Sequence, residues 1–507
     1  MSFRRVGRLA AVVLLTQMCL SCGQVYRPVV IPLTTTPPSP AGFHTVFAIS
    51  TNVPSYPGGA MQIDVAGDSI AAETPSSDRS APNLGNNPTH AAILPNFSRV
   101  FVASAGSVLP GGVDVLSSFT PAFQSTMSSG LGAVTTISLP AGSQPVFVTT
   151  TQSAAVYVAN YNTNSVSAIN TTLNVVSNSA PVGVNPVALA EMPNGLKIYA
   201  ANQGDNSVSS LNTADLTPNS VTGFTGITPV WAVARGDSQK VYVLTQGDGQ
   251  LVTIDTATDA VTSSLPVGAG ANFIFYDPHL NRLFVTNPLT SMVYVFSDSG
   301  GANDTPVQLV AYSFALGSIP CPTGPAACAP ASVTALPDGS RFYVASYQTA
   351  ASCPDPTVTG SCIIPSLTVF DANSLTVKYP SAPTMTLLTW SPPCASSPCQ
   401  TGPFAQNQYA VSPVATCAPA ALYSPSTTRF RIFTTSAADS SRVYVSMCDA
   451  GAIAVIDTTD SNANNPGGSG NPSDTLITDL PAAFSAGAIQ PTGEPPNQNP
   501  IFLLTGQ

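Results

Sequence analysis

One line of sequence recurs through the middle of this chain at a nearly constant spacing. Its four clearest copies read AVYVANYNTNSVSAINTT, KIYAANQGDNSVSSLNTA, KVYVLTQGDGQLVTIDTA and RLFVTNPLTSMVYVFSDS. Their leading aromatic residues, Tyr157, Tyr199, Tyr242 and Phe284, are separated by 42, 43 and 42 residues. A period of about 40 to 45 residues that contains several short strands is typical of the blades of a β-propeller. The repeat therefore predicts an all-β chain folded as a single propeller.

Each copy contains the strands of a blade. An aromatic-led strand, an Asn/Gly turn and a second strand ending in Asp or Asn together predict a hairpin. Two more strands are expected, one before each Pro-Val-Gly, as at residues 174–180 and 260–265, and one after it, as at residues 185–191. Pro181 and Pro266 mark the turns between them, because proline cannot continue a central strand. We therefore predict four-stranded blades.

The number of blades follows from counting these units between residues 43 and 507. Seven complete units are expected, led by Phe101, Tyr157, Tyr199, Tyr242, Phe284, Tyr343 and Tyr444. Fragments near Phe47 and Met61 at one end, and near Ala486 and Phe502 at the other, could combine into an eighth blade. Such a blade would close the ring with strands from both ends of the chain and remove exposed sheet edges. Eight blades are favoured by this count, and seven remain possible if a fragment is an extra strand.

The same lines resemble the YVTN-type β-propeller repeat family. Tyr157-Val158-Ala159-Asn160 and the later Asp255-Thr256 and Asp457-Thr458 stand at the landmark positions of that family. The resemblance is specific over residues 145–300, whereas the outer units carry insertions and have Ser104 and Ser346 in place of the landmark Asn. It implies the propeller fold, and propellers of this kind include lactonases and redox enzymes.

The N-terminal segment is typical of an export signal. Three arginines precede an apolar run at residues 9–15, which is too short to span a membrane. Leu20-Ser21-Cys22 resembles the lipobox of bacterial lipoproteins, so we expect residues 1–22 to be the signal and Cys22 to carry the lipid. Ordinary cleavage or an uncleaved anchor is the alternative. Residues 23–42 are rich in Pro and Thr and are expected to form a tether. This places the protein in the cell envelope, on the periplasmic side or at the cell surface, with the lipid as its membrane contact.

Charge excludes some partners. Only 8% of the residues are charged, and loss of the signal with its three arginines changes the net charge from −10 to −13. Proteins that bind nucleic acid cluster Lys and Arg against the phosphates, and no such cluster occurs after Arg8. We therefore expect no nucleic-acid partner.

Eight of the ten cysteines lie between residues 321 and 448, where an oxidising compartment would favour disulfides. Pairing neighbours predicts four bonds: Cys321–Cys328, Cys353–Cys362, Cys394–Cys399 and Cys417–Cys448. A zinc site is disfavoured because no nearby His completes a ligand set. The Cys/Pro-rich insertion at about residues 380–423 interrupts the repeat, and it is interpreted either as a recognition element or as a disulfide-stapled decoration.

Candidate ligand contacts are few. Trp231, Arg235 and His279 lie on or beside strands expected to line the propeller axis, although core or loop packing is the favoured interpretation. Asn160, Asn202 and Asn287 end aromatic-led strands, with Tyr161 and Tyr347 beside the same positions, and could face a glycan or peptide. The favoured interpretation is that these Asn side chains hold the hairpin turns by bonding to their own backbone.

Neither catalysis nor metal binding has a strong motif. Asp460, Asn462 and Asn464 have the alternate spacing of calcium ligands but lack the glycine and glutamate of an EF-hand loop. The histidines, His44, His90 and His279, are scattered and belong to no known catalytic motif. We expect no cofactor, no metal and no assignable catalytic residue.

The resulting prediction is an envelope-anchored binding or scaffolding module for a protein, glycan or wall polymer. The alternatives are a hydrolase or lactonase acting at the channel mouth and a structural surface-layer component. The ligand itself is not predicted, because function on such folds depends on variable loops.

Overall fold

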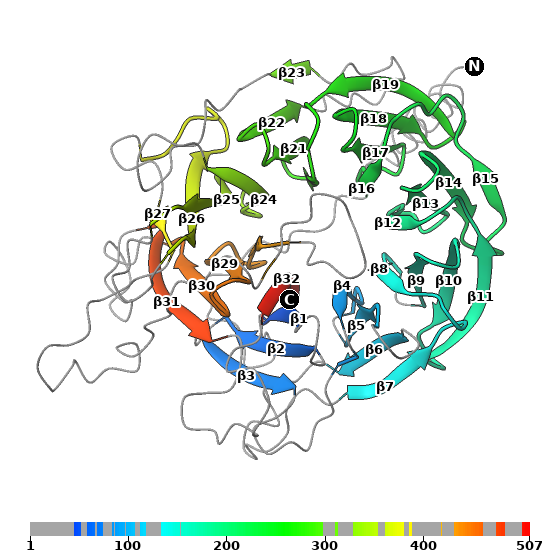
Figure 1. Ribbon diagram of the computed structural model, residues 1–507, viewed down its shortest axis with the longest axis horizontal. Coiled ribbons are helices and arrows are strands. Elements are labelled where there is room, and N and C mark those ends of the chain that lie inside the picture. The colour runs from blue at the N-terminus through cyan, green and yellow to red at the C-terminus, as the bar shows by residue number, and fades with distance from the viewer. Residues whose placement is uncertain are drawn as a thin grey trace, which may run out of the picture. The chain divides into compact units, whose positions relative to one another are not determined.

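The protein forms eight antiparallel sheets of four strands each (Figure 1). The computed structural model describes residues 45–51, 58–65, 68–74, 84–85, 87–96, 98–106, 112–117, 133–152, 154–297, 310–312, 328–352, 360–379, 385–387, 417, 430–459, 473–481 and 499–506. All regular elements within these residues are strands, and all of them belong to one compact unit, Pro40–Gln507. The predicted propeller is therefore confirmed, with eight blades rather than seven.

We number the blades in chain order and give each from its innermost to its outermost strand. Blade 1 consists of β32 (Asn499–Gly506), β1 (Thr45–Thr51), β2 (Gly59–Asp64) and β3 (Ser69–Thr74), and blade 2 of β4 (Pro88–Ile93), β5 (Arg99–Ser104), β6 (Gly112–Ser117) and β7 (Ala133–Ser138). Blade 3 consists of β8 (Pro145–Thr149), β9 (Ala155–Asn160), β10 (Ser165–Asn170) and β11 (Val175–Pro181), and blade 4 of β12 (Pro186–Glu191), β13 (Lys197–Asn202), β14 (Ser207–Asn212) and β15 (Pro218–Ser220). Blade 5 consists of β16 (Pro229–Ala234), β17 (Lys240–Thr245), β18 (Gln250–Asp255) and β19 (Ala260–Pro266), and blade 6 of β20 (Phe273–Asp277), β21 (Arg282–Asn287), β22 (Met292–Ser297) and β23 (Val310–Tyr312). Blade 7 consists of β24 (Ala329–Ala335), β25 (Arg341–Ala350), β26 (Cys362–Asp371) and β27 (Met385–Thr386), and blade 8 of β28 (Ile432–Ser436), β29 (Arg442–Met447), β30 (Ala452–Asp457) and β31 (Thr475–Pro481).

Blade 1 closes the ring. Its innermost strand is the C-terminal β32, which pairs antiparallel with β1 and places Leu504 opposite Phe47. Each innermost strand contacts the innermost strand of the next blade, including β32 with β4 and β28 with β32. The eighth blade predicted from both chain ends is therefore present, with Phe47, Met61 and Phe502 on its strands. Its fourth strand is β3 rather than a segment near Ala486, which lies outside the described residues.

The blade boundaries differ by one strand from the units defined by sequence. The aromatic-led strand is the second of its blade, since β8 pairs with β9 on the inner side of the sheet. The segment after Pro-Val-Gly, now β12, begins the next blade instead of completing the previous one. The cause is the crossover, because the chain passes from the outermost β11 directly to the innermost β12.

Burial explains why the second strands share an aromatic residue. Tyr199, Tyr242 and Phe284 are fully buried, because both faces of these strands are covered by protein. Such strands read as nearly continuous apolar runs. The outermost strands β11 and β19 instead each carry three Ser, Thr or Asn residues among seven, and their side chains are largely exposed or half-buried.

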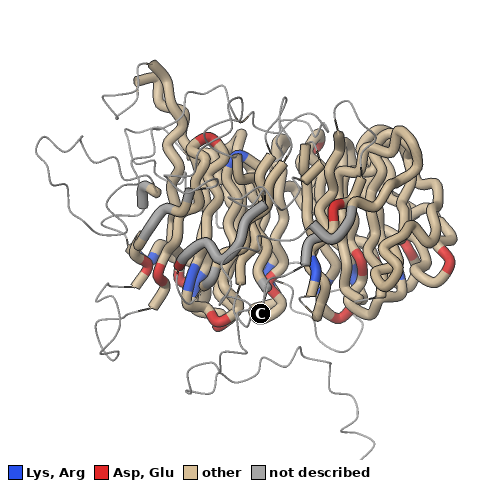
Figure 2. Tube along the Cα trace, turned by 90° about the horizontal axis from the view of Figure 1, so that it is seen from below, with Lys and Arg blue, Asp and Glu red and all other residues tan. Residues whose placement is uncertain are grey.

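Charged residues tie neighbouring blades together at one face. We call the lower face the one with the C-terminal end of β32, drawn at the bottom of Figure 2, and the upper face the opposite one. Four second strands begin at the lower face with a cation that reaches an Asp or Asn side chain in the turn before the outermost strand of the next blade. These inter-blade pairs are Arg99 with Asn174, Lys197 with Asp259, Arg341 with Asp474 and Arg442 with Asp68.

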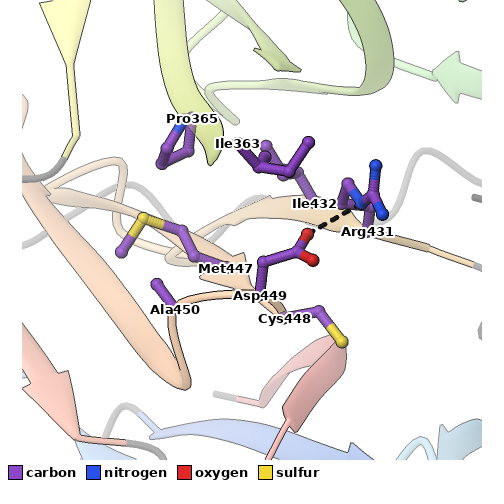
Figure 3. Close-up of a pocket in the computed structure, with 8 residues that line it drawn as sticks. All are labelled: Ile363, Pro365, Arg431, Ile432, Met447, Cys448, Asp449 and Ala450. Carbon is purple, nitrogen blue, oxygen red and sulfur yellow. Dashed lines mark ion pairs between the residues drawn. The ribbon is translucent and has the colours of Figure 1, made fainter. Parts of the chain in front are cut away.

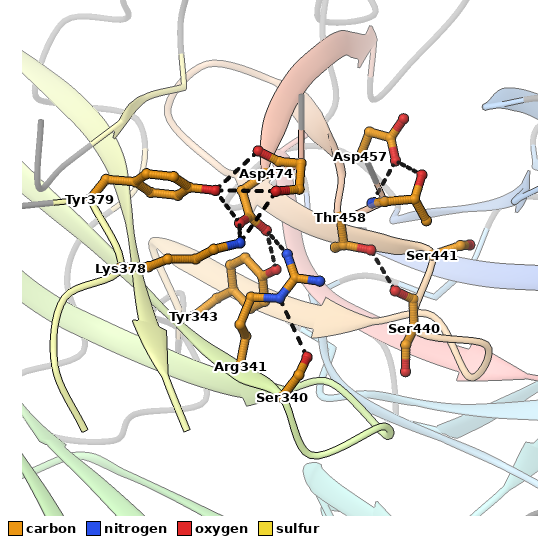
Figure 4. A network of polar contacts seen from close by, with 12 residues as sticks. Ser340, Arg341, Tyr343, Lys378, Tyr379, Ser440, Ser441, Asp457, Thr458 and Asp474 are labelled. Carbon is orange, nitrogen blue, oxygen red and sulfur yellow. Dashed lines mark hydrogen bonds and ion pairs between the residues drawn. The ribbon is translucent and has the colours of Figure 1, made fainter. Parts of the chain in front are cut away.

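The acceptors of these pairs share an unusual backbone conformation. Asp68, Asn174, Asp259 and Asp474 have φ values of 47°, 52°, 52° and 61°, a region that Asn and Asp tolerate better than most residues. The Asp or Asn at each of these positions thus meets two needs, since it makes the turn and supplies the acceptor. Figure 4 shows the densest case, in which Asp474 is contacted by Arg341 at 2.5 Å, Lys378 at 2.6 Å and the hydroxyls of Tyr343 and Tyr379.

Candidate functional site

The axis of the ring is filled by an aromatic hub. Six side chains from the inner strands contact one another in a closed circle, in which neighbouring ring centroids lie between 3.7 and 5.7 Å apart. A seventh ring, Phe430, contacts four members of this circle. None of the seven is more than 7% exposed. The circle consists of His90, Phe147, Trp231, Phe273, Phe433 and Phe502.

Backbone irregularity helps aim four of these rings at the axis, one of which is Phe502, which follows Pro500 across a register shift. Pro88, Pro145 and Pro229 begin their inner strands, where a missing N–H is tolerated. The register shifts immediately after each of them, so His90, Phe147 and Trp231 follow a bulge. Bulges redirect side chains. The sequence Pro-x-aromatic is thus the local signal of the hub.

Trp231 is a core residue. It makes edge contacts with Phe147 at 5.5 Å and Phe273 at 5.3 Å, and it is 6% exposed. The structure supports the packing interpretation rather than the ligand interpretation, because a buried Trp contributes chiefly its large apolar area. His90 stacks on Phe147 at 3.7 Å in the same cluster.

Arg235 and His279 lie at the lower face, at the ends of two inner strands. Arg235 is buried, pairs with Asp237 at 2.6 Å and donates to Gln239. His279 lies against Asp277, which accepts its backbone N–H and is 3.4 Å from its Nδ1. Both side chains hold turns of their own blades, and the structure does not join them into one site.

The landmark Asn residues are buried and structural. Asn160 donates to Ser165 and Ser167, and Asn202 makes the equivalent bonds to Ser207 and Ser209. Asn287 donates to the carbonyl of Val267 and accepts from the amides of its own turn. All three are fully buried. They do not line a face, and the hairpin interpretation is supported, although Asn160 and Asn202 use serine hydroxyls rather than their own backbone.

The two tyrosines near these positions have different surroundings. Tyr161 is half-buried against the core, and its amide donates to the carbonyl of Gln144. Burial raises its pKa. Tyr347 lies at the upper end of β25, where the guanidinium of Arg431 is 5.3 Å from its ring centre. Tyr347 therefore borders the pocket described next.

A small pocket lies at the upper face between blades 7 and 8 (Figure 3). Its charged residues are Arg431, just before β28, and Asp449, in the turn after β29, whose Nε and Oδ2 atoms are 2.7 Å apart. The remaining lining is Ile363, Pro365, Ile432, Met447, Cys448 and Ala450. The cavity between these residues has a volume of about 10 Å³, room for about one water molecule and far below the roughly 300–1,000 Å³ of small-molecule sites.

The charges of this pocket are compensated by the protein. Burial raises the pKa of Asp449 to about 7, although the guanidinium of Arg431 and the amide of Cys417 oppose that change. Arg431 also donates through Nη2 to the carbonyl of Cys417. Both side chains of the ion pair are at most 6% exposed. The arrangement can stabilise a folded segment, and Asp449 is a carboxyl able to exchange a proton near neutral pH.

A disulfide joins Cys417 to Cys448 at the edge of this pocket. It is one of the four pairs expected from the sequence, and it attaches the insertion at residues 380–423 to blade 8. Asn499 supports it by donating to the carbonyl of Cys448 at 2.8 Å. Cys328 and Cys362 are also disulfide-bonded.

Several predicted positions lie outside the described residues. They include the signal with Cys22, the tether at residues 23–42, His44, and the loop with Asp460, Asn462 and Asn464. The partners expected for Cys328 and Cys362, namely Cys321 and Cys353, also lie there, together with Cys394, Cys399 and most of the insertion. Within the described part of the chain, no group of three or more acidic, His or Cys side chains could hold a metal, and no helix has the length and hydropathy needed to cross a membrane.

Sequence reasoning missed three charged residues. Arg431 occupies the position at which most inner strands have proline. This departure from the Pro-x-aromatic pattern was the feature of the sequence that could have identified it. Asp449 occupies a turn in which other blades also carry Asp. Glu191 ends β12, is 4% exposed, and accepts the amide of Thr151 at 2.8 Å. Burial raises the pKa of Glu191 to about 7 against hydrogen bonds from Thr151. Nothing local in the sequence marks it as buried.

Comparisons with known proteins found solved structures that resemble this chain at low sequence identity. No protein-family model matches the chain, and no curated protein sequence matches it. A putative 6-phosphogluconolactonase from Bacteroides uniformis is 12% identical, with a TM-score of 0.48 over 68% of this chain and 96% of that one. The periplasmic gluconolactonase of Pseudomonas aeruginosa is 10% identical, with a TM-score of 0.46 over 91% and 99%. The Cps50 β-propeller domain of Myceliophteria thermophila is 9% identical, with a TM-score of 0.46 over 74% and 96%.

Proposed function

We propose that this protein is an exported binding or scaffolding module, anchored in the cell envelope through a lipid on Cys22. The observation that carries the proposal is the aromatic hub, because it fills the axis where many propellers place a ligand site with packed side chains. The charged groups described near the axis serve internal contacts, as Arg431 does with Asp449. The broad faces of the ring are then the surfaces available to a protein, glycan or wall polymer.

The upper face is organised to bind without large rearrangement. Asn164 and Asn206 each accept, through Oδ1, the backbone amide that leads into the next blade, at Asn185 and Thr228. The carbonyl of Asn185 in turn accepts from Gln203 in the following hairpin. Each turn is thus bonded to the blade on either side. Preorganised surfaces lose less conformational entropy on association, which favours affinity.

The test is cross-linking in the native envelope, followed by capture and mass spectrometry. We expect one envelope protein or glycan fraction in a stoichiometric amount. A Cys22→Ser variant is the matched control for the anchor, and we expect it to lose both lipid labelling and the membrane fraction. Recovery of no partner from the wild-type protein would overturn the binding role, whereas retention of Cys22→Ser in the membrane would overturn only the anchor.

A hydrolase acting at the upper face is the second candidate. Asp449 favours it, because it combines a pocket position with a pKa of about 7, as expected of an acid–base group. Screening lactones and esters with the wild type and Asp449→Asn would test it. Turnover that is lost in Asp449→Asn would support the enzyme, and an unreactive wild type would oppose it. A surface-layer role instead requires self-association, which a monodisperse monomer at high concentration would exclude.

A further inference from the structure

Three neighbouring blades expose a large aliphatic side chain at the same rim of the upper face. Val184 is 41% exposed, Ile227 50% and Leu289 77%. Val184 and Ile227 occupy equivalent places, two residues before the proline that begins the inner strands of blades 4 and 5. Leu289 lies in the β21–β22 turn of blade 6. Single exposed aliphatic residues are ordinary, whereas here three of them recur at one rim of neighbouring blades.

The backbone under these side chains is held firmly. The amide of Gly204 donates to the carbonyl of Val184 at 2.8 Å, and that of Gly247 donates to Ile227 at 2.9 Å. Leu289 packs over Gly270, where an added Cβ would lie 2.3 Å from Leu289 Cδ1. The rim therefore presents its aliphatic groups on bonded turns, so little order has to be gained on binding.

The charges at this rim have one sign. Asp205 is exposed in the β13–β14 turn and Asp248 is half-buried in the β17–β18 turn. Among the residues that the structure describes, every Lys and Arg except Arg431 lies at the lower face, as Figure 2 shows by colour. Arg431 is buried against Asp449 in blade 8. A basic partner would therefore meet carboxylates beside the aliphatic side chains. Among the described residues of this rim, no Lys or Arg would repel it.

We propose that the rim formed by Val184, Asp205, Ile227, Asp248 and Leu289 docks a basic amphipathic segment of a protein partner. The inference rests on the proposed binding function and names the chemistry of its partner. Apolar side chains of the segment cover the three aliphatic residues, and its Lys or Arg side chains approach Asp205 and Asp248. Complementary charge speeds association and selects the partner, while the buried apolar contacts supply affinity.

The experiment measures binding of a defined probe by fluorescence anisotropy. The probe is a synthetic helix of about 18 residues with leucine on one face and lysine on the other, a common mode of peptide recognition. Its counterpart carries glutamate in place of lysine. The protein is the mature chain with Cys22→Ser, which needs no detergent. We expect the lysine probe to bind, salt to weaken it, and the glutamate probe to bind at least about tenfold more weakly.

Two double variants locate the binding. Ile227→Ser with Leu289→Ser should weaken the lysine probe by about tenfold or more. The matched control, Leu173→Ser with Leu196→Ser, removes lower-face leucines that are 68% and 62% exposed and should leave binding unchanged. Equal losses in both variants, equal binding of both probes, or no binding of the lysine probe would each overturn the proposal. If the rim variant still captures the envelope partner, the binding function stands and this surface is wrong.

Discussion

Glu191 offers a sharp test of the electrostatics of this fold. The side chain ends the inner strand β12 and is 4% exposed, with Oε2 bonded to the amide of Thr151. Burial raises its pKa from 4.5 to about 7, against hydrogen bonds from Thr151. The folded protein therefore holds a proton on Glu191 at pH values where the unfolded chain has released it.

The direction in which stability changes with pH follows from this difference in proton binding between the folded and unfolded states. Between about pH 4.5 and 7 the folded state binds more protons than the unfolded state, so the free energy of unfolding falls as pH rises. The stabilisation from Glu191 is fully present below the pKa of Glu191 in the unfolded chain and is lost above its pKa in the folded protein. A change from 4.5 to about 7 corresponds to an upper value of about 3 kcal/mol, at about 1.4 kcal/mol for each pH unit.

The assay is urea unfolding of the wild type and Glu191→Gln at pH 5 and pH 8. Glutamine keeps an acceptor for Thr151 but does not titrate. Between pH 5 and pH 8, the free energy of unfolding of the wild type should fall by about 2–3 kcal/mol more than that of the variant. Asp215→Asn is the control, because Asp215 is exposed with a lowered pKa and stays ionised at both pH values. If Glu191→Gln keeps the full wild-type pH dependence, the reasoning is wrong.

Three further changes test the packing. Asp474→Asn should reduce the free energy of unfolding by about 2–3 kcal/mol in urea, because it leaves Arg341 and Lys378 without their shared carboxylate; an unchanged midpoint would contradict the inter-blade pairing. Cys417→Ser should lower stability by about 2–4 kcal/mol, and non-reducing peptide mapping of the wild type should recover a Cys417–Cys448 peptide; free thiols at both positions would refute the bond. Trp231→Ala should cost about 3–5 kcal/mol and Trp231→Phe less, measured by thermal unfolding, since the side chain packs in the hub; near-wild-type stability of Trp231→Ala would argue for a site role instead.

Local sequence patterns were sufficient to predict the strands and hairpins of the blades, because these elements are specified by residues close together in the sequence. Alternation, turn residues and the aromatic lead at Tyr199 or Tyr242 report strands and hairpins directly, and the period reports their repetition. The same reasoning misplaced the blade boundary by one strand, because hydrogen-bond pairing across a crossover leaves no local mark. It favoured structural roles for Trp231 and the landmark Asn residues but kept ligand contacts as alternatives, since exposure cannot be read from residue type alone.

The sequence by itself determined the fold class, the four-stranded blades, the closure by both chain ends and the preference for eight blades over seven. Apart from the Cys417–Cys448 bond, which the sequence predicted, only the tertiary structure decided which side chains meet. His90 reaches Phe502 in the hub, and Arg442 reaches Asp68 across 374 positions of sequence. Such contacts depend on ring closure, which brings together residues that no local spacing relates. The physical reason is that strand formation follows short-range patterns, whereas burial, ion pairing and shifted pKa values arise between blades.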